Sequence, residues 1–156
     1  MARVTTRPAE TRDAETIHQL IVSFVPEFTV DPDPASYADY LELVSVSALE
    51  GYIANKETCY RVAMLDDRLV GAAAMRHDAH LFHFFVAGDC HGQGIGRKML
   101  DELCSIVGGD RFTVNATPNA RAVYRHLGFV ETDEQQSSHG IYYTPMELRI
   151  DRRSAS

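Results

Sequence analysis

The sequence predicts a single mixed α/β domain, on three observations: composition, length, and a hydrophobic period that changes along the chain. Hydrophobic residues make up 45% of the chain and charged residues 24%, which is typical of a globular domain and too apolar for a disordered one. A chain of 156 residues is most simply one domain, which buries roughly 70% of its unfolded surface. We expect one domain over residues 1–150 and a polar tail over residues 151–156.

The first third of the chain predicts a short strand and two helices. Residues 3–7 are a strand candidate, and Asp13 is a candidate N-cap for the first helix. Apolar residues behind Asp13 follow helical i, i+3, i+4, i+7 spacing: Ile17, Leu20, Ile21 and Phe24. Pro26 ends this helix, and a second helix is predicted over residues 35–54.

The middle of the chain changes to strand patterns. The pattern predicts a hairpin of two strands, over residues 58–65 and 69–75, joined at Asp66-Asp67-Arg68. Residues 80–87 are nearly continuously hydrophobic, which is typical of a buried central strand.

The last part of the chain alternates between helices and strands. A loop with four glycines ends at Gly96 and leads directly into a helix. This helix ends at Gly108-Gly109. Residues 111–115 predict a strand. Asn119 opens a short helix with Ala120, Val123, Tyr124 and Leu127 on one face, and Gly128 stops it. A final strand pair is expected around residues 137–140.

The glycine loop has the form of an anion-binding site. The first turn of a helix carries unpaired N–H groups and the positive end of the helix dipole. Glycines at 92, 94 and 96 let a phosphate approach the backbone without obstruction by Cβ atoms. The loop lacks the Gly-Lys-Ser/Thr of a Walker loop, and its Gly-x-Gly-x-Gly spacing differs from the dinucleotide fingerprint.

Two motifs in this order resemble the GNAT superfamily of acetyl-CoA-dependent N-acetyltransferases. The first is His91-Gly-Gln-Gly-Ile-Gly96, a match to the pyrophosphate loop pattern Q/R-x-x-G-x-G/A with His in place of Gln or Arg. The second runs from Asn115 through Asn119 and Tyr124 to Gly128-Phe129. The resemblance implies a mostly antiparallel sheet of about seven strands with a splayed central parallel pair and four helices.

The resemblance also implies where the co-substrate acetyl-CoA binds. It would enter the split between the central strands, with its pyrophosphate on residues 91–97. Local charge agrees with this, because residues 91–126 carry five basic and three acidic side chains in a chain of formal charge −7. The residues implied in coenzyme binding are Phe85, Val86, His91, Gly92, Gln93, Gly94, Ile95, Gly96, Arg97, Asn119 and Tyr124.

The same resemblance assigns roles in catalysis. Tyr124 is the candidate acid that protonates the leaving thiolate, and a backbone N–H within residues 85–87, best that of Val86, polarises the thioester carbonyl. His80, at the start of the central strand, is the candidate base. His83 and an ordered water are alternatives, and alternation along a strand places His80 and His83 on opposite faces. Asn119 would hold the pantetheine arm or cap its helix.

Other chemistries and partners are disfavoured. The spacing of His77, His80 and His83 does not converge on a metal, so no metal is expected. Cys90 has no obvious paired base for a covalent acetyl-cysteine. The acidic balance disfavours nucleic-acid binding, and no apolar run approaches the roughly 20 residues of a membrane helix. Three scattered cysteines and no signal peptide predict a cytoplasmic protein.

The expected reaction is direct transfer of an acetyl group to a primary amine. The amine is a small molecule or a peptide and would approach past the first helices and the final hairpin, where Phe28, Tyr37 and Tyr40 are candidate lining residues. The alternative is a domain that binds acyl-CoA as a sensor without turnover. The sequence leaves open the identity of the acceptor, the use of longer acyl groups and the oligomeric state. Homodimers are common in the family that the sequence resembles.

Overall fold

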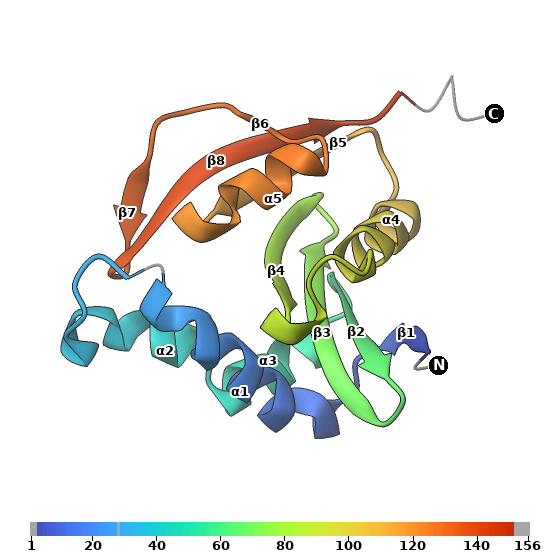
Figure 1. Ribbon diagram of the computed structural model, residues 1–156, viewed down its shortest axis with the longest axis horizontal. Coiled ribbons are helices and arrows are strands. Elements are labelled where there is room, and N and C mark those ends of the chain that lie inside the picture. Colours follow the sequence, from blue (N-terminus) through green and yellow to red (C-terminus); the bar gives the residue numbers. More distant parts are fainter. Residues whose placement is uncertain (1–2, 28, 152–156) are drawn as a thin grey trace.

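The structure, a computed structural model, describes residues 3–27 and 29–151. A twisted sheet carries helices on both faces (Figure 1). The strands are β1 (Val4–Pro8), β2 (Thr58–Leu65), β3 (Arg68–Arg76), β4 (His80–Val86), β5 (Arg111–Ala116), β6 (Val130–Glu131), β7 (Gln136–Ser138) and β8 (Ile141–Arg149). The α-helices are α1 (Ala14–Phe24), α2 (Ala38–Leu43), α3 (Val46–Ala54), α4 (Ile95–Val107) and α5 (Arg121–His126).

The sheet has the mixed topology that the sequence predicts. Its strand order is β1-β2-β3-β4-β5-β8-β6, with β7 paired to β8. All neighbours are antiparallel except β4 and β5, which are parallel. Over residues 3–27 and 29–151 the sheet has eight strands rather than about seven, because the segment before β8 forms two short strands, β6 and β7, that both pair with it.

The central parallel pair opens almost as soon as it forms. Only His80 with Thr113 and Leu81 with Val114 are paired, and beyond them β4 and β5 diverge (Figure 1). The expected splayed pair is therefore confirmed. The remaining length of β4 has its edge toward β5 without a strand partner, which leaves backbone groups available for a ligand.

The strand β4 also contains an irregularity that the sequence does not predict. Ala74 of β3 pairs with His83, but the next residue, Met75, pairs with Leu81, so Phe82 is an extra residue in β4. Such a bulge interrupts the alternation of side chains between the two faces. The expectation that His80 and His83 lie on opposite faces is therefore wrong, since it assumed an unbroken strand.

Two apolar clusters hold the helices to the sheet. On one face, α4 and α5 pack through buried residues that include Met99, Leu103 and Tyr124. On the other face, α1 and α3 pack through Ile17, Ile21 and Leu49. The helical spacing seen in the sequence for the first helix thus marks its buried face, and α4 shows the same kind of spacing at Met99, Leu100 and Leu103.

The helix expected over residues 35–54 is two helices. α2 ends at Leu43, and Ser45 is the N-cap of α3, where its Oγ accepts a hydrogen bond of 3.1 Å from the Ala48 N–H. A serine side chain that satisfies a first-turn N–H starts a new helix. The break redirects the chain, so that α2 lies beside the end of the sheet near β7 (Figure 1).

The turn between β7 and β8 is anchored to the segment before α2. The Val30 N–H donates to the Gly140 carbonyl at 2.9 Å, and Thr29 forms a bridge with Ile141. Gly140 has φ +80°, and a Cβ there would lie 2.2 Å from the Ser36 carbonyl oxygen. Only glycine fits this contact, which fixes the final hairpin against the N-terminal helices.

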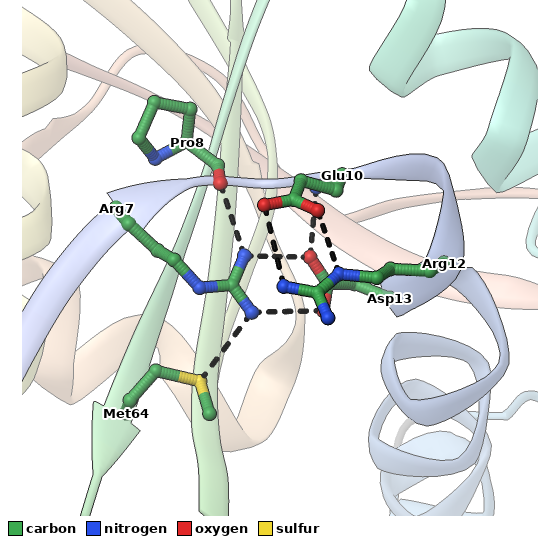
Figure 2. A network of polar contacts seen from close by, with 6 residues as sticks. All are labelled: Arg7, Pro8, Glu10, Arg12, Asp13 and Met64. Carbon is green, nitrogen blue, oxygen red and sulfur yellow. Dashed lines mark hydrogen bonds and ion pairs between the residues drawn. The ribbon is translucent and has the colours of Figure 1, made fainter. Parts of the chain in front are cut away.

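The N-terminal strand is tied to α1 by an ion pair rather than by the expected helix cap (Figure 2). Asp13 directly precedes α1, but its carboxylate makes no cap hydrogen bond to that helix. It accepts two hydrogen bonds from the Arg7 guanidinium, at 2.7 and 2.9 Å, and one of 2.7 Å from the Glu10 N–H. The hydrogen bond from Arg7 is the main cause that lowers the pKa of Asp13.

We expect Asp13→Asn to lower the free energy of unfolding by about 1–3 kcal/mol at pH 7, because one nitrogen of the half-buried Arg7 guanidinium loses its acceptor. Since the folded-state pKa of Asp13 is depressed, its contribution is complete above the unfolded pKa of about 3.9 and is lost as pH falls through the folded value. Urea unfolding of both proteins at several pH values measures this. A stability difference that grew at acid pH would contradict it.

Candidate functional site

The N-terminus of α4 presents N–H groups for which the described residues supply no acceptor. α4 is 13 residues long, and its N-cap is Gly94, which has no side chain to accept from the first turn. The first helical hydrogen bond runs from the Lys98 N–H to the Gly94 carbonyl at 3.0 Å. The N–H groups of Ile95, Gly96 and Arg97 precede it and have no acceptor within the helix. Together with the helix dipole they give this end of α4 the geometry that favours an anion.

The three glycines of the loop are needed for different structural reasons. Gly92 and Gly94 adopt φ values of +81° and +76°, in the left-handed region that most side chains disfavour. Gly96 lies inside α4, and a Cβ there would lie 3.1 Å from the Phe84 ring. The first two glycines therefore shape the loop, and the third lets α4 approach β4 closely.

His91 connects the loop to the end of β4. Its Nε2 lies 2.8 Å from the Val86 carbonyl oxygen, and because a carbonyl only accepts, Nε2 carries the proton. The side chain at this unusual motif position thus holds the loop against the strand, which agrees with a role in shaping the loop.

The N–H of Val86 points into the split between the strands. The neighbouring Ala87 N–H donates to the Val70 carbonyl on β3 at 2.8 Å. Successive residues of a strand direct their N–H and C=O groups to opposite edges, so those of Val86 face β5, which has already diverged. The Val86 carbonyl accepts the hydrogen bond from His91, and the Val86 N–H is left to donate to a ligand.

Two cavities meet at the split, which we call the loop-side cavity and the hairpin-side cavity. The loop-side cavity contains most of the predicted coenzyme residues: Phe85, Val86, His91, Gly92, Gly94, Ile95, Gly96, Asn119 and Tyr124. Gln93 and Arg97, also predicted, do not line it. The Arg97 guanidinium instead donates to the His126 carbonyl at 3.3 Å, between α4 and α5.

Tyr124 lies where the two cavities join. It lines both of them, and its ring packs against Phe84 and Phe129 with centroids 5.6 and 5.4 Å apart. The ring therefore belongs to the core while one side reaches the cleft. Burial, with a smaller effect of Tyr40, raises the pKa of the Tyr124 phenol. It is a protonated donor at neutral pH.

The two candidate bases lie in different surroundings. His80 lines the hairpin-side cavity, and its Nδ1 lies 2.7 Å from Thr113 Oγ1. Burial, with a smaller effect of Arg76, lowers its pKa, so the imidazole is neutral at pH 7. His83 is buried with its Nδ1 2.9 Å from the Tyr60 hydroxyl, and burial lowers its pKa to about 3. His83 lines neither cavity.

Asn119 lies in a 3₁₀ turn (Pro118–Ala120) before α5 and lines the loop-side cavity. Its Oδ1 accepts 2.8 Å from the Thr117 hydroxyl, and its amide donates to Glu27 at 3.5 Å. It makes no side-chain cap for α5, whose N-cap residue is Ala120. The expectation that Asn119 caps its helix is therefore wrong, because the 3₁₀ turn shifts the start of α5 past it.

The alternative chemistries gain no support. Cys90 lines the loop-side cavity, but burial raises the pKa of its thiol, which disfavours a thiolate. In the described part of the chain, no group of three or more His, Cys, Asp or Glu residues is placed to hold a metal ion. Nor is any helix there both long and apolar enough to cross a membrane.

The sequence missed several residues that line the cavities. Phe24, Phe84 and Thr117 line the loop-side cavity and were not predicted. Val123, expected on the buried stripe of its helix, lines the same cavity and is 50% exposed. Of the aromatics expected near the acceptor, Tyr40 lines the hairpin-side cavity. Tyr37 is packed with Val25 and Ile141 in a small core. Phe28 lies outside the described residues.

Comparison with known proteins agrees with this geometry. Residues 28–150 match the family model described as Acetyltransferase (GNAT) domain, and the chain belongs to this family of acetyltransferases. No curated protein matches the chain.

Solved structures share the fold at low sequence identity. A GCN5-related N-acetyltransferase from Rhodopseudomonas palustris aligns with a TM-score of 0.76 at 19% identity, over 96% of this chain and 98% of the other. The PaiA N-acetyltransferase of Thermoplasma acidophilum in complex with coenzyme A gives 0.70 at 18%, over 94% and 99%. The ribosomal-protein-S18-alanine N-acetyltransferase of Escherichia coli gives 0.66 at 18%, over 96% and 95%.

Proposed function

We propose that the protein transfers the acetyl group of acetyl-CoA directly to a primary amine in a ternary complex. The observation that carries this is the arrangement of donors around the loop-side cavity: the first-turn amides of α4, the N–H of Val86 and the Tyr124 phenol. The coenzyme diphosphate would bind the N–H groups of the loop, since a helix N-terminus favours phosphate. Its pantetheine arm then follows the open edge of β4 toward Tyr124.

The reaction needs a donor to the carbonyl oxygen, an acid for the leaving sulfur and an acceptor for the amine proton, and we assign these roles to Val86, Tyr124 and His80 or water. The Val86 N–H would donate to the thioester carbonyl oxygen as the carbon becomes tetrahedral. The amine nitrogen bonds to that carbon while the C–S bond breaks and its electron pair goes to sulfur. Tyr124 gives a proton to this sulfur, and the proton lost by the amine passes to His80 or through water to solvent.

A sensor that binds acyl-CoA without turnover is the competing function. Both would hold the coenzyme, but only an enzyme needs Tyr124 at the junction of two cavities. Release of free thiol from acetyl-CoA, followed with a panel of primary amines, tests the proposal. We expect release that depends on the amine, together with a mass increase of 42 Da in the amine, roughly that of an acetyl group replacing a hydrogen. Tight coenzyme binding without release for any amine would support the sensor.

We expect His80→Gln to lower kcat/KM for the amine about tenfold at pH 7, because a general base is lost and water takes its place. The neutral imidazole is the active form, and its pKa is lowered. The kcat/KM of the native protein should therefore stay level as the pH falls to about 6.5, the ordinary pKa of a histidine. It should decline at lower pH.

This decline should be absent in the variant. His77→Gln is the matched control, because His77 is exposed and lines neither cavity. Equal pH–rate profiles for the native protein and His80→Gln would assign the base to water.

A further inference from the structure

The hairpin-side cavity lies on the far side of Tyr124 from the coenzyme loop. It is bounded by β4 and β5 where they diverge, by Tyr40 and Leu43 of α2, and by the turn between β7 and β8. It shares Phe84, Phe85 and Tyr124 with the loop-side cavity. If the proposed function holds, this is where the acceptor amine must lie to reach the thioester, and the following argument rests on that function.

The lining of this cavity is rich in aromatic rings and poor in charged residue types. Among the described residues, none that lines it is Asp, Glu, Lys or Arg. Six of them are aromatic rings: Tyr40, Phe82, Phe84, Phe85, Tyr124 and Tyr143. Several of its polar groups are already engaged within the protein. His80 contacts Thr113, Ser138 contacts His139 at 2.8 Å, and the Tyr143 hydroxyl donates to Gln136 at 3.0 Å.

The two charged groups that affect the ionisation of His80 are paired with each other. Arg76 and Asp78, which affect the ionisation of His80, form an exposed ion pair at 3.2 Å. They do not line the cavity. A second charge on an acceptor would therefore find no carboxylate, ammonium or guanidinium partner in the described lining of the cavity, and burying an unpaired charge is strongly unfavourable.

The lining of the hairpin-side cavity disfavours two classes of acceptor and favours a third. Diamines and polyamines carry a further ammonium group that needs a carboxylate, and amino acids carry a carboxylate that needs a cation. Aromatic rings instead provide apolar contact for a flat body and attract the one ammonium group through their faces. We propose that the acceptor is a monoamine with an aromatic or other apolar body, of the arylalkylamine type.

Matched pairs of acceptors test this with the full chain and acetyl-CoA. 2-Phenylethylamine and phenylalanine differ by one carboxylate, and butylamine and 1,4-diaminobutane differ by one ammonium group. We expect kcat/KM to be at least about tenfold higher for the singly charged member of each pair, since a factor of ten is about 1.4 kcal/mol. A preference for phenylalanine or for 1,4-diaminobutane would overturn the inference while the proposed function stands. No release with any amine would overturn both.

A charge placed in the cavity gives a second readout. Asn115 lines it from β5, with an exposed side chain, and Asn115→Asp adds a carboxylate with little change in size. We expect the ratio of kcat/KM for 1,4-diaminobutane over butylamine to rise about tenfold in Asn115→Asp and to stay at the native value in Asn115→Ala. An unchanged ratio in a folded Asn115→Asp protein would contradict the proposed place of the acceptor.

Discussion

Tyr124→Phe should lower kcat for acetyl transfer about 100-fold, the lower end of what a positioned acid contributes. The KM for acetyl-CoA and the thermal stability should change little. The ring of Tyr124 packs between Phe84 and Phe129, and phenylalanine keeps this packing while it removes only the hydroxyl. A loss in kcat without a change in KM marks an interaction that exists only in the transition state. Steady-state kinetics and thermal melting measure the two effects.

A matched control separates this role from the general loss of a tyrosine hydroxyl. Tyr52 lines neither cavity, and its hydroxyl donates to the Leu43 carbonyl at 2.9 Å. We expect Tyr52→Phe to retain native kcat. If Tyr124→Phe also retained native kcat, the thiolate would leave without a protein acid, and Tyr124 would be a core residue only.

Gly94→Asp should weaken coenzyme A binding at least about tenfold relative to Gly94→Asn. Both side chains tolerate the left-handed φ of +76° at this position better than other residues do. They have nearly the same size and differ by one negative charge. That charge would lie at the amides of the α4 N-terminus, where it competes with and repels a diphosphate.

Calorimetric titration with coenzyme A measures the difference between these two variants. Because the effect is electrostatic at an exposed loop, it should shrink as salt is raised. Equal affinities of the Asp and Asn variants at low salt would mean that no anion binds at this helix end. The diphosphate would then have to lie elsewhere.

Local patterns explain how much of the fold was predictable. The start of α4 follows from glycines whose chemistry acts within a few residues, and its buried stripe follows from helical spacing. The break at Ser45 carries a local signal, since serine is a favoured N-cap residue. Apolar residues at helical spacing on both sides of it hid the break: Tyr37, Tyr40, Leu41, Val44 and Ala48. At Ser45 the cap was a better guide than the periodic pattern, whereas Asp13 and Asn119 resemble caps and make no cap hydrogen bond to their helices.

Contacts between distant elements explain what the sequence could not show. The bulge at Phe82 arises from pairing with β3, and it changed the faces assigned to the histidines on β4. The contact of His91 with the Val86 carbonyl depends on how the loop folds back on its strand. Val123 has an apolar side chain at helical spacing, which does not distinguish a core position from the wall of a cavity.

The most direct test of the account is a crystal structure of the protein with coenzyme A. We predict diphosphate oxygens within hydrogen-bonding distance of the N–H groups between residues 92 and 97, and the coenzyme sulfur beside the Tyr124 hydroxyl. A coenzyme that bound with its diphosphate away from these N–H groups, or with its sulfur remote from the opening between β4 and β5, would contradict the account.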